Sequence, residues 1–303
     1  MRRRTMFAMP ARRRGPRGGY NFAVMAYGSS VSALPIEKFF FDTCTSVYSQ
    51  TLANDQTRDG PSSFGNFSQG YFAGGYTGSP TTQVTRYSFG ADTIVLASTM
   101  ANGTGRYSAG FGHLNVGYST LNGFSGKYTF ANDVTASATT LGYSAQLLAA
   151  ISGQDYGVVA GGYSSLSNTD RYRYSNDTRA AATALGAGRY GLSGMSGPIF
   201  GVFVCGYNLS IFPTGTDEYN HATGTRTSGT AIDSTDQPQG GGGVADVHAG
   251  RQCGGGVSTS GTVQVYHWST SSVTFGSNRL SFARRYAGHV SGCAPHLSTI
   301  APV

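Results

Sequence analysis

Histidine and cysteine are the side chains of this sequence that could hold a metal ion or attack a substrate. The histidines are His113, His221, His248, His267, His289 and His296, and the cysteines are Cys44, Cys205, Cys253 and Cys293. Zinc sites need such ligands at short spacings, and no Cys-x-x-Cys pair occurs here. His248 and His289 could face a common channel, but no glutamate or cysteine stands at ligand spacing. The sequence therefore predicts no metal site, and we expect the cysteines to be free thiols, buried as small apolar side chains.

Motifs for phosphate binding and hydrolysis do not stand out either. Gly240–Gly243 is rich in glycine, but no Gly-Lys-Ser/Thr follows it, and lysine occurs only at positions 38 and 127. We interpret this run as part of a flexible insertion over residues 233–243. No Gly-x-Ser-x-Gly elbow lies between a predicted strand and a helix. We therefore expect no enzyme, no catalytic residue and no cofactor.

The net charge of +7 is concentrated at the N-terminus. Seven of the 21 basic residues lie before any acidic residue occurs, at Arg2, Arg3, Arg4, Arg12, Arg13, Arg14 and Arg17. The rest of the chain carries equal numbers of basic and acidic groups. Residues 1–19 cannot bury enough apolar surface to fold alone. We expect them to form an anchoring arm whose arginines bind phosphates of nucleic acid or carboxylates of another protein, and the sequence leaves both partners open.

Composition narrows the fold class. Of the 303 residues 45 are glycine and 12% are charged, whereas an average chain has about 25% charged residues. Hydrophobic residues make up 39% and aromatic residues 12%, which is enough for a packed core and excludes disorder throughout. Glycine does not recur at every third position, which excludes collagen, and no run of about 18 apolar residues predicts a membrane span. We expect a β-rich protein without a secretory signal.

A repeat organises the chain after the arm. Its clearest copies are Gly70–Tyr76, Tyr156–Tyr163 and Phe200–Tyr207, which end in Gly-Gly-Tyr or Cys-Gly-Tyr. With weaker copies included, we place equivalent glycines at positions 28, 75, 117, 162, 206 and 255, which are 42 to 49 residues apart. A period of this length is typical of propeller blades or helical arrays.

Two further landmarks accompany each glycine motif. The first is a pair of residues separated by one position, at Phe39 and Phe41, Tyr87 and Phe89, Tyr128 and Phe130, Tyr172 and Tyr174, Tyr219 and His221, and Tyr266 and Trp268. This alternation places both side chains on one face of a strand. The second is an apolar residue 13 or 14 positions after the first aromatic, at Leu52, Met100, Leu141, Leu185, Ile232 and Leu280. We expect it to end the next strand.

Each unit is predicted to be a meander of four strands. Asparagine and aspartate favour a hairpin turn after the aromatic strand, at Ala91–Thr93, Asn132–Val134 and Asn176–Thr178. A short glycine-rich strand then begins the next unit, as in Arg106–Gly110, Arg189–Gly194 and Arg285–Gly288. Four strands in each repeat describe a propeller blade.

The two ends of the chain predict how the ring closes. Residues 19–28 begin at the second strand of a blade, and residues 284–293 supply a first strand with nothing after it. Together the ends complete one blade, which removes the free edge that an open ring would carry. We therefore predict an all-β, six-bladed propeller over residues 20–295 with a composite closing blade from both termini, an arm at 1–19 and a tail at 296–303.

The apolar-apolar-Gly-Gly motif followed by an aromatic strand is similar to Kelch-type propeller repeats, over all six units. The sequence of Gly70–Gly78 also resembles repeats of marine bacteriophage tail and virion proteins. The chain departs from the Kelch pattern because Trp268 is its single tryptophan. The resemblance implies a phage tail or capsid-surface component, assembled in the host cytoplasm and present in many copies on a virion.

Two functions remain open at this stage. The arm and the resemblance favour a non-enzymatic virion structural protein, whose arm binds other virion proteins or packaged nucleic acid and whose propeller could attach to a host glycan. The alternative is a carbohydrate-binding propeller outside any particle. It is favoured by 19 tyrosines and 17 phenylalanines, since aromatic rings bind partners and sugars at low entropic cost. The repeated core does not account for Tyr107, Tyr143, Tyr190 and Tyr286.

Overall fold

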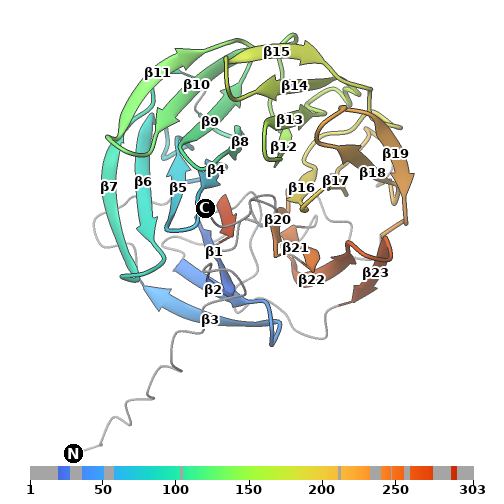
Figure 1. The fold of residues 1–303 in the computed structure, drawn as a ribbon, viewed down its shortest axis with the longest axis horizontal. Helices are drawn as coiled ribbons and strands as arrows, with labels where there is room; N and C mark the ends of the chain where they lie inside the picture. Colours follow the sequence, from blue (N-terminus) through green and yellow to red (C-terminus); the bar gives the residue numbers. More distant parts are fainter. Residues whose placement is uncertain are drawn as a thin grey trace, which may run out of the picture.

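The computed structural model of the chain contains six antiparallel sheets arranged around a central axis, as a six-bladed β-propeller (Figure 1). The structure describes residues 20–27, 36–50, 58–102, 105–210, 213–232, 240–246, 248–255, 260–275 and 288–291. Over these residues every regular element is a strand, and no helix occurs that could span a membrane. The prediction of an all-β propeller with six blades is confirmed.

Each blade has its first strand nearest the axis and its fourth strand at the rim (Figure 1). From the axis outwards, blade 1 contains β24 (Gly288–Ser291), β1 (Phe22–Ala26), β2 (Ile36–Phe40) and β3 (Thr45–Gln50); blade 2 contains β4 (Ser62–Gly65), β5 (Gln69–Ala73), β6 (Gln83–Ser88) and β7 (Thr93–Thr99); and blade 3 contains β8 (Ala109–Gly112), β9 (Val116–Leu121), β10 (Phe124–Thr129) and β11 (Val134–Ala138). In the same order, blade 4 contains β12 (Ala149–Ser152), β13 (Tyr156–Ala160), β14 (Thr169–Arg173) and β15 (Thr178–Ala181); blade 5 contains β16 (Ser193–Ser196), β17 (Phe200–Val204), β18 (Thr216–Asn220) and β19 (Arg226–Gly229); and blade 6 contains β20 (Gly242–Ala245), β21 (Ala249–Gly255), β22 (Ser260–His267) and β23 (Ser272–Phe275).

Blade 1 is built from both ends of the chain. Strand β1 pairs antiparallel with β24, which places Val24 opposite Val290 and Met25 opposite His289. Strand β24 also contacts the first strands of blades 6 and 2, so the inner strands form a closed ring. The predicted composite closing blade is confirmed.

The predicted aromatic pairs form the core between blades. The first member of each pair is at most 1% exposed and the second at most 9%. Rings of neighbouring blades pack against each other. Tyr71 of blade 2 stacks on Phe130 of blade 3, with 4.8 Å between ring centroids. The ring of Phe111 in blade 3 is tilted against that of Tyr172 in blade 4, with 5.2 Å between ring centroids. The prediction that both aromatics share one buried face is confirmed.

Short turns join the third and fourth strands of each blade. The fourth residue of the turn has a left-handed backbone with φ between 47° and 69° in all six blades, at Cys44, Asp92, Asp133, Asp177, Gly224 and Ser271. Aspartate tolerates this conformation better than most residues with a side chain. The hairpin turns predicted around Asp92, Asp133 and Asp177 are confirmed.

The first strands approach one another so closely that only glycine fits at several positions. A Cβ atom on Gly110 of β8 would overlap the backbone of Ser63 on β4, and a Cβ atom on Gly243 of β20 would overlap the carbonyl of Gly194 on β16. Glycine lets these neighbouring backbones meet. The interpretation of Gly240–Gly243 as a flexible insertion was therefore wrong, since Gly242 and Gly243 begin β20; residues 233–239 lie outside the described residues.

The prediction that the apolar landmark ends the fourth strand was wrong, because the landmark residue follows that strand. Strand β7 ends at Thr99, before Met100, and β19 ends at Gly229, three residues before Ile232. The landmark residue is buried, and its N–H donates to a carbonyl just before the third strand of its own blade. For Met100 this acceptor is Thr82, at 2.7 Å. In blades 2 to 5 the landmark residue therefore joins the end of the fourth strand to the start of the third. Leu52 and Leu280 lie outside the described residues.

Two further boundaries of the repeat were placed wrongly. Gly117 was placed at the end of the second strand of blade 3, but it lies inside β9, opposite Tyr128. The residues that follow this strand are Asn122 and Gly123, whose φ angles are 52° and 84°. Asparagine stands in for the first glycine there because it tolerates a left-handed backbone. The first strands also begin later than predicted, at Ala109 and Ser193.

Antiparallel meanders place the loops on two opposite faces. The loops before the first strands, and those between second and third strands, lie on one face, which we call the pocket face. The loops between first and second strands, and the turns after the third, lie on the other. The chain enters the propeller on this second face. The carbonyl of Asn21 accepts the N–H of Phe41 at 3.2 Å, and in blade 2 the carbonyl of Ser68, in the loop between first and second strands, accepts the N–H of Phe89 in the same way. We call it the N-terminal face.

Candidate functional site

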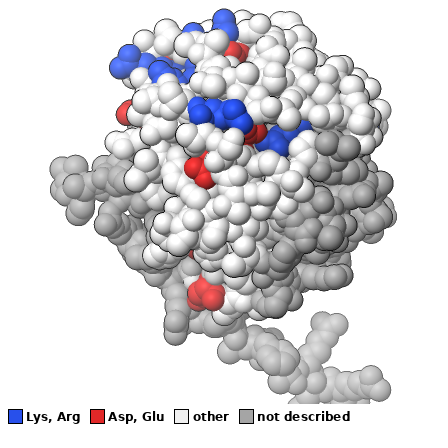
Figure 2. Space-filling view, turned by 90° about the vertical axis from the view of Figure 1, so that its right-hand side faces the viewer, with Lys and Arg blue, Asp and Glu red and all other residues white. Residues whose placement is uncertain are grey.

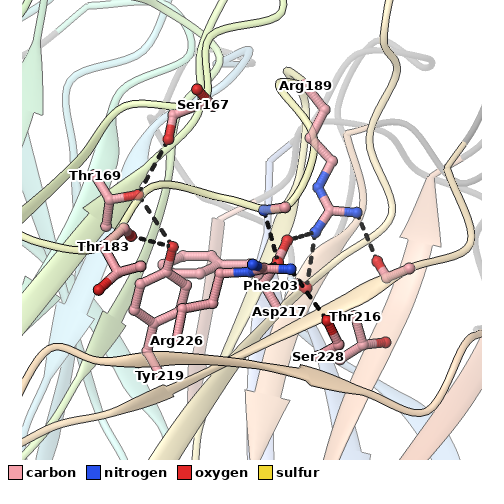
Figure 3. Close-up of polar contacts among 12 residues, drawn as sticks. Ser167, Thr169, Thr183, Arg189, Phe203, Thr216, Asp217, Tyr219, Arg226 and Ser228 are labelled. Atoms are coloured by element: carbon pink, nitrogen blue, oxygen red, sulfur yellow. Dashed lines mark hydrogen bonds and ion pairs between the residues drawn. The ribbon is translucent and has the colours of Figure 1, made fainter.

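A network of buried charges lies inside blade 5 (Figure 3). Asp217 on β18 accepts from Arg189, which precedes β16, and from Arg226 on β19. Arg189 is 1% exposed and also donates to the carbonyls of Gly215 at 2.6 Å and Phe203 at 3.3 Å. Burial lowers the pKa of Arg189, and the negative charge of Asp217 opposes that shift. The network ties the loop before blade 5 to the sheet beneath it.

Blade 4 contains a reduced version of the same network. Asp170 stands where Asp217 stands, binds Arg179 Nη1 at 3.0 Å, and accepts the N–H of Gly142 at 2.6 Å. The Gly186 N–H donates to Asp217 in the equivalent way, at 3.0 Å. Repetition in two blades indicates a structural role for these ion pairs.

Arg58 is a further buried charged residue that sequence reasoning missed. It stands four positions before its first strand, as Arg189 does, and is 1% exposed. It donates to the carbonyls of Gly74 and Gln83 and, at 2.5 Å, to the hydroxyl of Tyr27 in the neighbouring blade. The shared spacing before the first strand was the available signal.

A second set of ion pairs joins neighbouring blades. The basic residue before the first aromatic of one blade binds the turn aspartate of the next blade, in the pairs Lys38 and Asp92, Arg86 and Asp133, and Lys127 and Asp177. The hydroxyl of Tyr128 also donates to Asp133 at 2.7 Å, and burial together with this carboxylate raises the pKa of Tyr128. These carboxylates therefore have structural partners.

Few acidic side chains remain at the surface. Among the described residues, Asp42 and Asp155 are the only acids that are classed as exposed. On the side shown in Figure 2, acidic side chains lie among basic ones. The charges of the propeller thus largely balance one another.

His221, His248 and His289 belong to three different blades. His221 takes the second aromatic position of blade 5, with Nε2 3.1 Å from the Gly197 carbonyl, and burial lowers its pKa to about 4. His289 is buried on β24 beside Gly242, whereas His248 is exposed on the N-terminal face. The described residues contain no group of three side chains that could hold a metal ion.

The cysteines of the described chain are free thiols, as expected. Cys205 and Cys253 are buried, and burial raises the pKa of Cys253 to about 12. Cys205 has φ 61° and takes the place of the first glycine in its motif. Cys44 was predicted to be buried, but it is only half-buried because it stands in a turn. Cys293 lies outside the described residues.

A small pocket lies where the loops before the first strands meet on the pocket face. Each of the five such loops that the structure describes has a left-handed residue two positions before its strand, at Gly60, Tyr107, Leu147, Gly191 and Gly240. From Tyr107 onwards, the N–H of each of these residues donates to the carbonyl of the one before it, at 2.8 to 3.1 Å. These residues line a cavity of about 80 Å³ together with Pro61, Ser108, Leu148, Leu192 and Gly241.

An exposed aromatic ring and two half-buried ones lie beside this pocket. Tyr163 is 60% exposed and its ring lies 5.5 Å from that of Tyr190, which meets Tyr207 edge-on at 5.6 Å. We call these three residues the tyrosine trio. The Tyr163 N–H donates at 2.8 Å to the carbonyl of Gln146, the residue before Leu147 of the pocket. The trio and the pocket are therefore neighbours at the seam of blades 4 and 5.

The tyrosines that the core did not explain separate into two kinds. Tyr107 lines the pocket and Tyr190 belongs to the trio. Tyr143 instead packs against the core cluster of blades 3 and 4, and burial raises its pKa. Tyr286 lies outside the described residues.

The predicted anchoring arginines, Arg2 to Arg4, Arg12 to Arg14 and Arg17, also lie outside the described residues. The described chain begins at Tyr20, whose ring stacks on Phe89 at 5.8 Å between centroids. This contact lies at the seam of blades 1 and 2, on the N-terminal face. The chain therefore joins the propeller on the face opposite the pocket.

Comparison with known proteins identifies the fold. No family model matches the chain, and no curated protein is similar in sequence. Among solved structures it is similar to YjhT, a propeller, with a TM-score of 0.66 over 84% of this chain and 94% of that chain, at 12% sequence identity. An identity this low shows a shared fold alone, because propellers host unrelated functions.

Proposed function

We propose that this protein is a non-enzymatic structural component of a virion, at a phage tail or capsid surface, and that its N-terminal arm fixes it there. The charge balance of the propeller supports this proposal. Only Asp42 and Asp155 are exposed acids of the described surface, so it offers no acidic patch for seven arginines. Guanidinium groups in such number need an anionic partner. The partner is then another molecule, either packaged nucleic acid or a neighbouring virion protein.

The position of Tyr20 supports a display role. It lies on the N-terminal face, so an arm that precedes it begins on the side away from the pocket. Nineteen residues span at most about 65 Å when fully extended. An arm of this length can hold a particle on one side and leave the pocket face open to solvent.

Deletion of residues 2–17 tests this proposal. The truncated chain should keep the midpoint of thermal unfolding of the full chain, because it retains every described strand from β1 onwards. Mass spectrometry of purified particles should no longer detect it. Replacing all seven arginines by glutamine should have the same effect, whereas replacing them by lysine should retain part of the incorporation through charge. Incorporation of the truncated chain at the full-length level, or recovery of the full-length chain only as a soluble monomer, would contradict the proposal.

A second candidate is a carbohydrate-binding propeller that belongs to no particle. The tyrosine trio beside the pocket favours it, because rigid, exposed rings are suited to sugar binding. Purification distinguishes the two candidates: this one predicts a soluble protein that binds sugars equally well with and without residues 2–17.

A further inference from the structure

Tyr163 and Tyr76 occupy the same position in their blades, after the two glycines that follow the second strand. Each ring meets the residue that stands two or three positions before the first strand of the next blade. For Tyr76 this residue is Arg106, and for Tyr163 it is Tyr190. The repeat therefore provides an internal comparison of a covered ring with an open one.

The ring of Tyr76 is covered by a charged partner. The guanidinium of Arg106 lies 5.4 Å from the centroid of Tyr76 and 4.5 Å from that of Tyr107. An ion pair with Asp59 at 2.6 Å holds the guanidinium in place. A cation held over an aromatic ring occupies that ring face, which a ligand would otherwise contact.

The ring of Tyr163 is open and held in place. It is 60% exposed, and its neighbours are the rings of Tyr190 and, behind that, Tyr207. Its backbone is fixed on both sides, because the N–H groups of Gly162 and Tyr163 donate to carbonyls of Arg189 and Gln146 at 3.0 and 2.8 Å. A ring already fixed in position loses little conformational entropy when it binds a ligand.

The neighbouring pocket limits the size and charge of what can enter it. Its volume of about 80 Å³ is small, so it suits a short substituent better than a whole sugar ring. None of its ten lining residues is charged. The nearby cation, Arg106, is already paired with Asp59.

We infer that the tyrosine trio and the pocket form a binding site for a neutral oligosaccharide. The apolar C–H face of one sugar ring lies on Tyr163, and a short substituent, such as an acetamido or hydroxymethyl group, enters the pocket beside Leu147 and Gly191. Among the described residues the site has no unpaired cation to replace the hydration of a sialylated or sulfated sugar, so we expect such sugars not to bind. The inference goes beyond the proposed anchoring role, since the site lies on the face opposite the one on which Tyr20 packs.

Binding of the full chain to an array of neutral, sialylated and sulfated oligosaccharides tests this inference, followed by calorimetric titration of the best neutral one. We expect neutral sugars to bind and Tyr163→Ala to weaken that binding about tenfold, the loss of roughly one stacking contact. Tyr163→Trp should retain binding. Tyr76→Ala and Ile199→Ala are the matched controls, because Tyr76 is the covered equivalent and Ile199 is 68% exposed on the other face.

Several outcomes would overturn the inference: no neutral sugar bound at millimolar concentration, binding of charged sugars only, or equal binding by Tyr163→Ala and the unchanged protein. Capture of a protein ligand by the trio, with no sugar bound, would also overturn it. Incorporation into particles is measured separately, so failure of the sugar site leaves the anchoring proposal standing, and the reverse also holds.

Discussion

Val24 and Val290 lie opposite each other in one antiparallel ladder, although they come from the two ends of the chain. The pairing joins the second strand of blade 1 to its first strand, which the chain supplies last. Formation of blade 1 therefore requires contact between segments of very large sequence separation, which slows folding. In return, β1 gains its inner partner β24, and blade 1 is a complete four-stranded sheet.

A chain that ends at residue 287 should fail to fold cooperatively, because β1 loses its inner partner β24. We expect a lower midpoint of urea unfolding and a tendency to associate through the exposed edge, measured by size-exclusion chromatography. The fluorescence of Trp268 is a suitable probe, since this single tryptophan is buried in blade 6. A chain that ends at residue 295 is the control and should unfold like the full protein. Equal midpoints for the two truncated chains would contradict the closing role of β24.

Asp217→Asn should be strongly destabilising, because it leaves the buried guanidinium of Arg189 without a countercharge. Loss of one partner of a buried ion pair costs about 3–5 kcal/mol. The control is Asp133→Asn, which breaks a pair whose side chains are 30% and 29% exposed and should cost at most about 1 kcal/mol. Urea unfolding measures both, and a double change that also replaces Arg189 by methionine should recover part of the loss. A similar, small cost for both aspartates would show that the network does not stabilise blade 5.

The sequence was sufficient to predict the fold because the blade repeats features with short-range causes. Aromatic pairs at alternate positions report a buried strand face, and aspartate in a left-handed turn reports a hairpin, as at Asp133. The incomplete first and last units predicted the closure between β1 and β24. Each of these signals lies within a few neighbouring residues.

The site could be predicted only in part, because it depends on contacts between blades. Tyr107 and Tyr190 stood out from the core pattern, but nothing in the sequence showed that the ring of Tyr163 stays open while that of Tyr76 is covered. The difference arises from the residues that the next blade brings against each ring. The glycines of β20 were misread for the same reason, since their role depends on the backbone of β16.

Gly110→Ala should destabilise the propeller, because the new methyl group would overlap the backbone of Ser63 in the neighbouring first strand. Backbone cannot move aside as a side chain can, so we expect a loss of about 1–3 kcal/mol or more in the free energy of unfolding. The matched control is Gly215→Ala, where a methyl group would meet nothing within 4 Å and the backbone is not left-handed. Chemical unfolding of both variants decides the matter. Equal stability would mean that the inner ring is less tightly packed than its geometry indicates.

His221 should make the protein less stable as the pH falls from 6.5 towards 4. Burial holds its folded pKa at about 4, below the ordinary value of 6.5, so in this range the unfolded chain binds a proton that the folded chain does not. The free energy of unfolding therefore rises with pH across this window, by an amount on the order of 3 kcal/mol. His221→Phe should remove this slope, because phenylalanine does not titrate and occurs at the same position in blades 1 and 2, as Phe41 and Phe89. The His221→Phe variant also lacks the hydrogen bond to the Gly197 carbonyl, which costs about 1 kcal/mol at neutral pH. The two proteins are therefore compared by how their free energy of unfolding changes with pH, and not by its absolute value. Unfolding by urea at a series of pH values gives both curves, and parallel curves between pH 4 and 6.5 would show that His221 is not the titrating group.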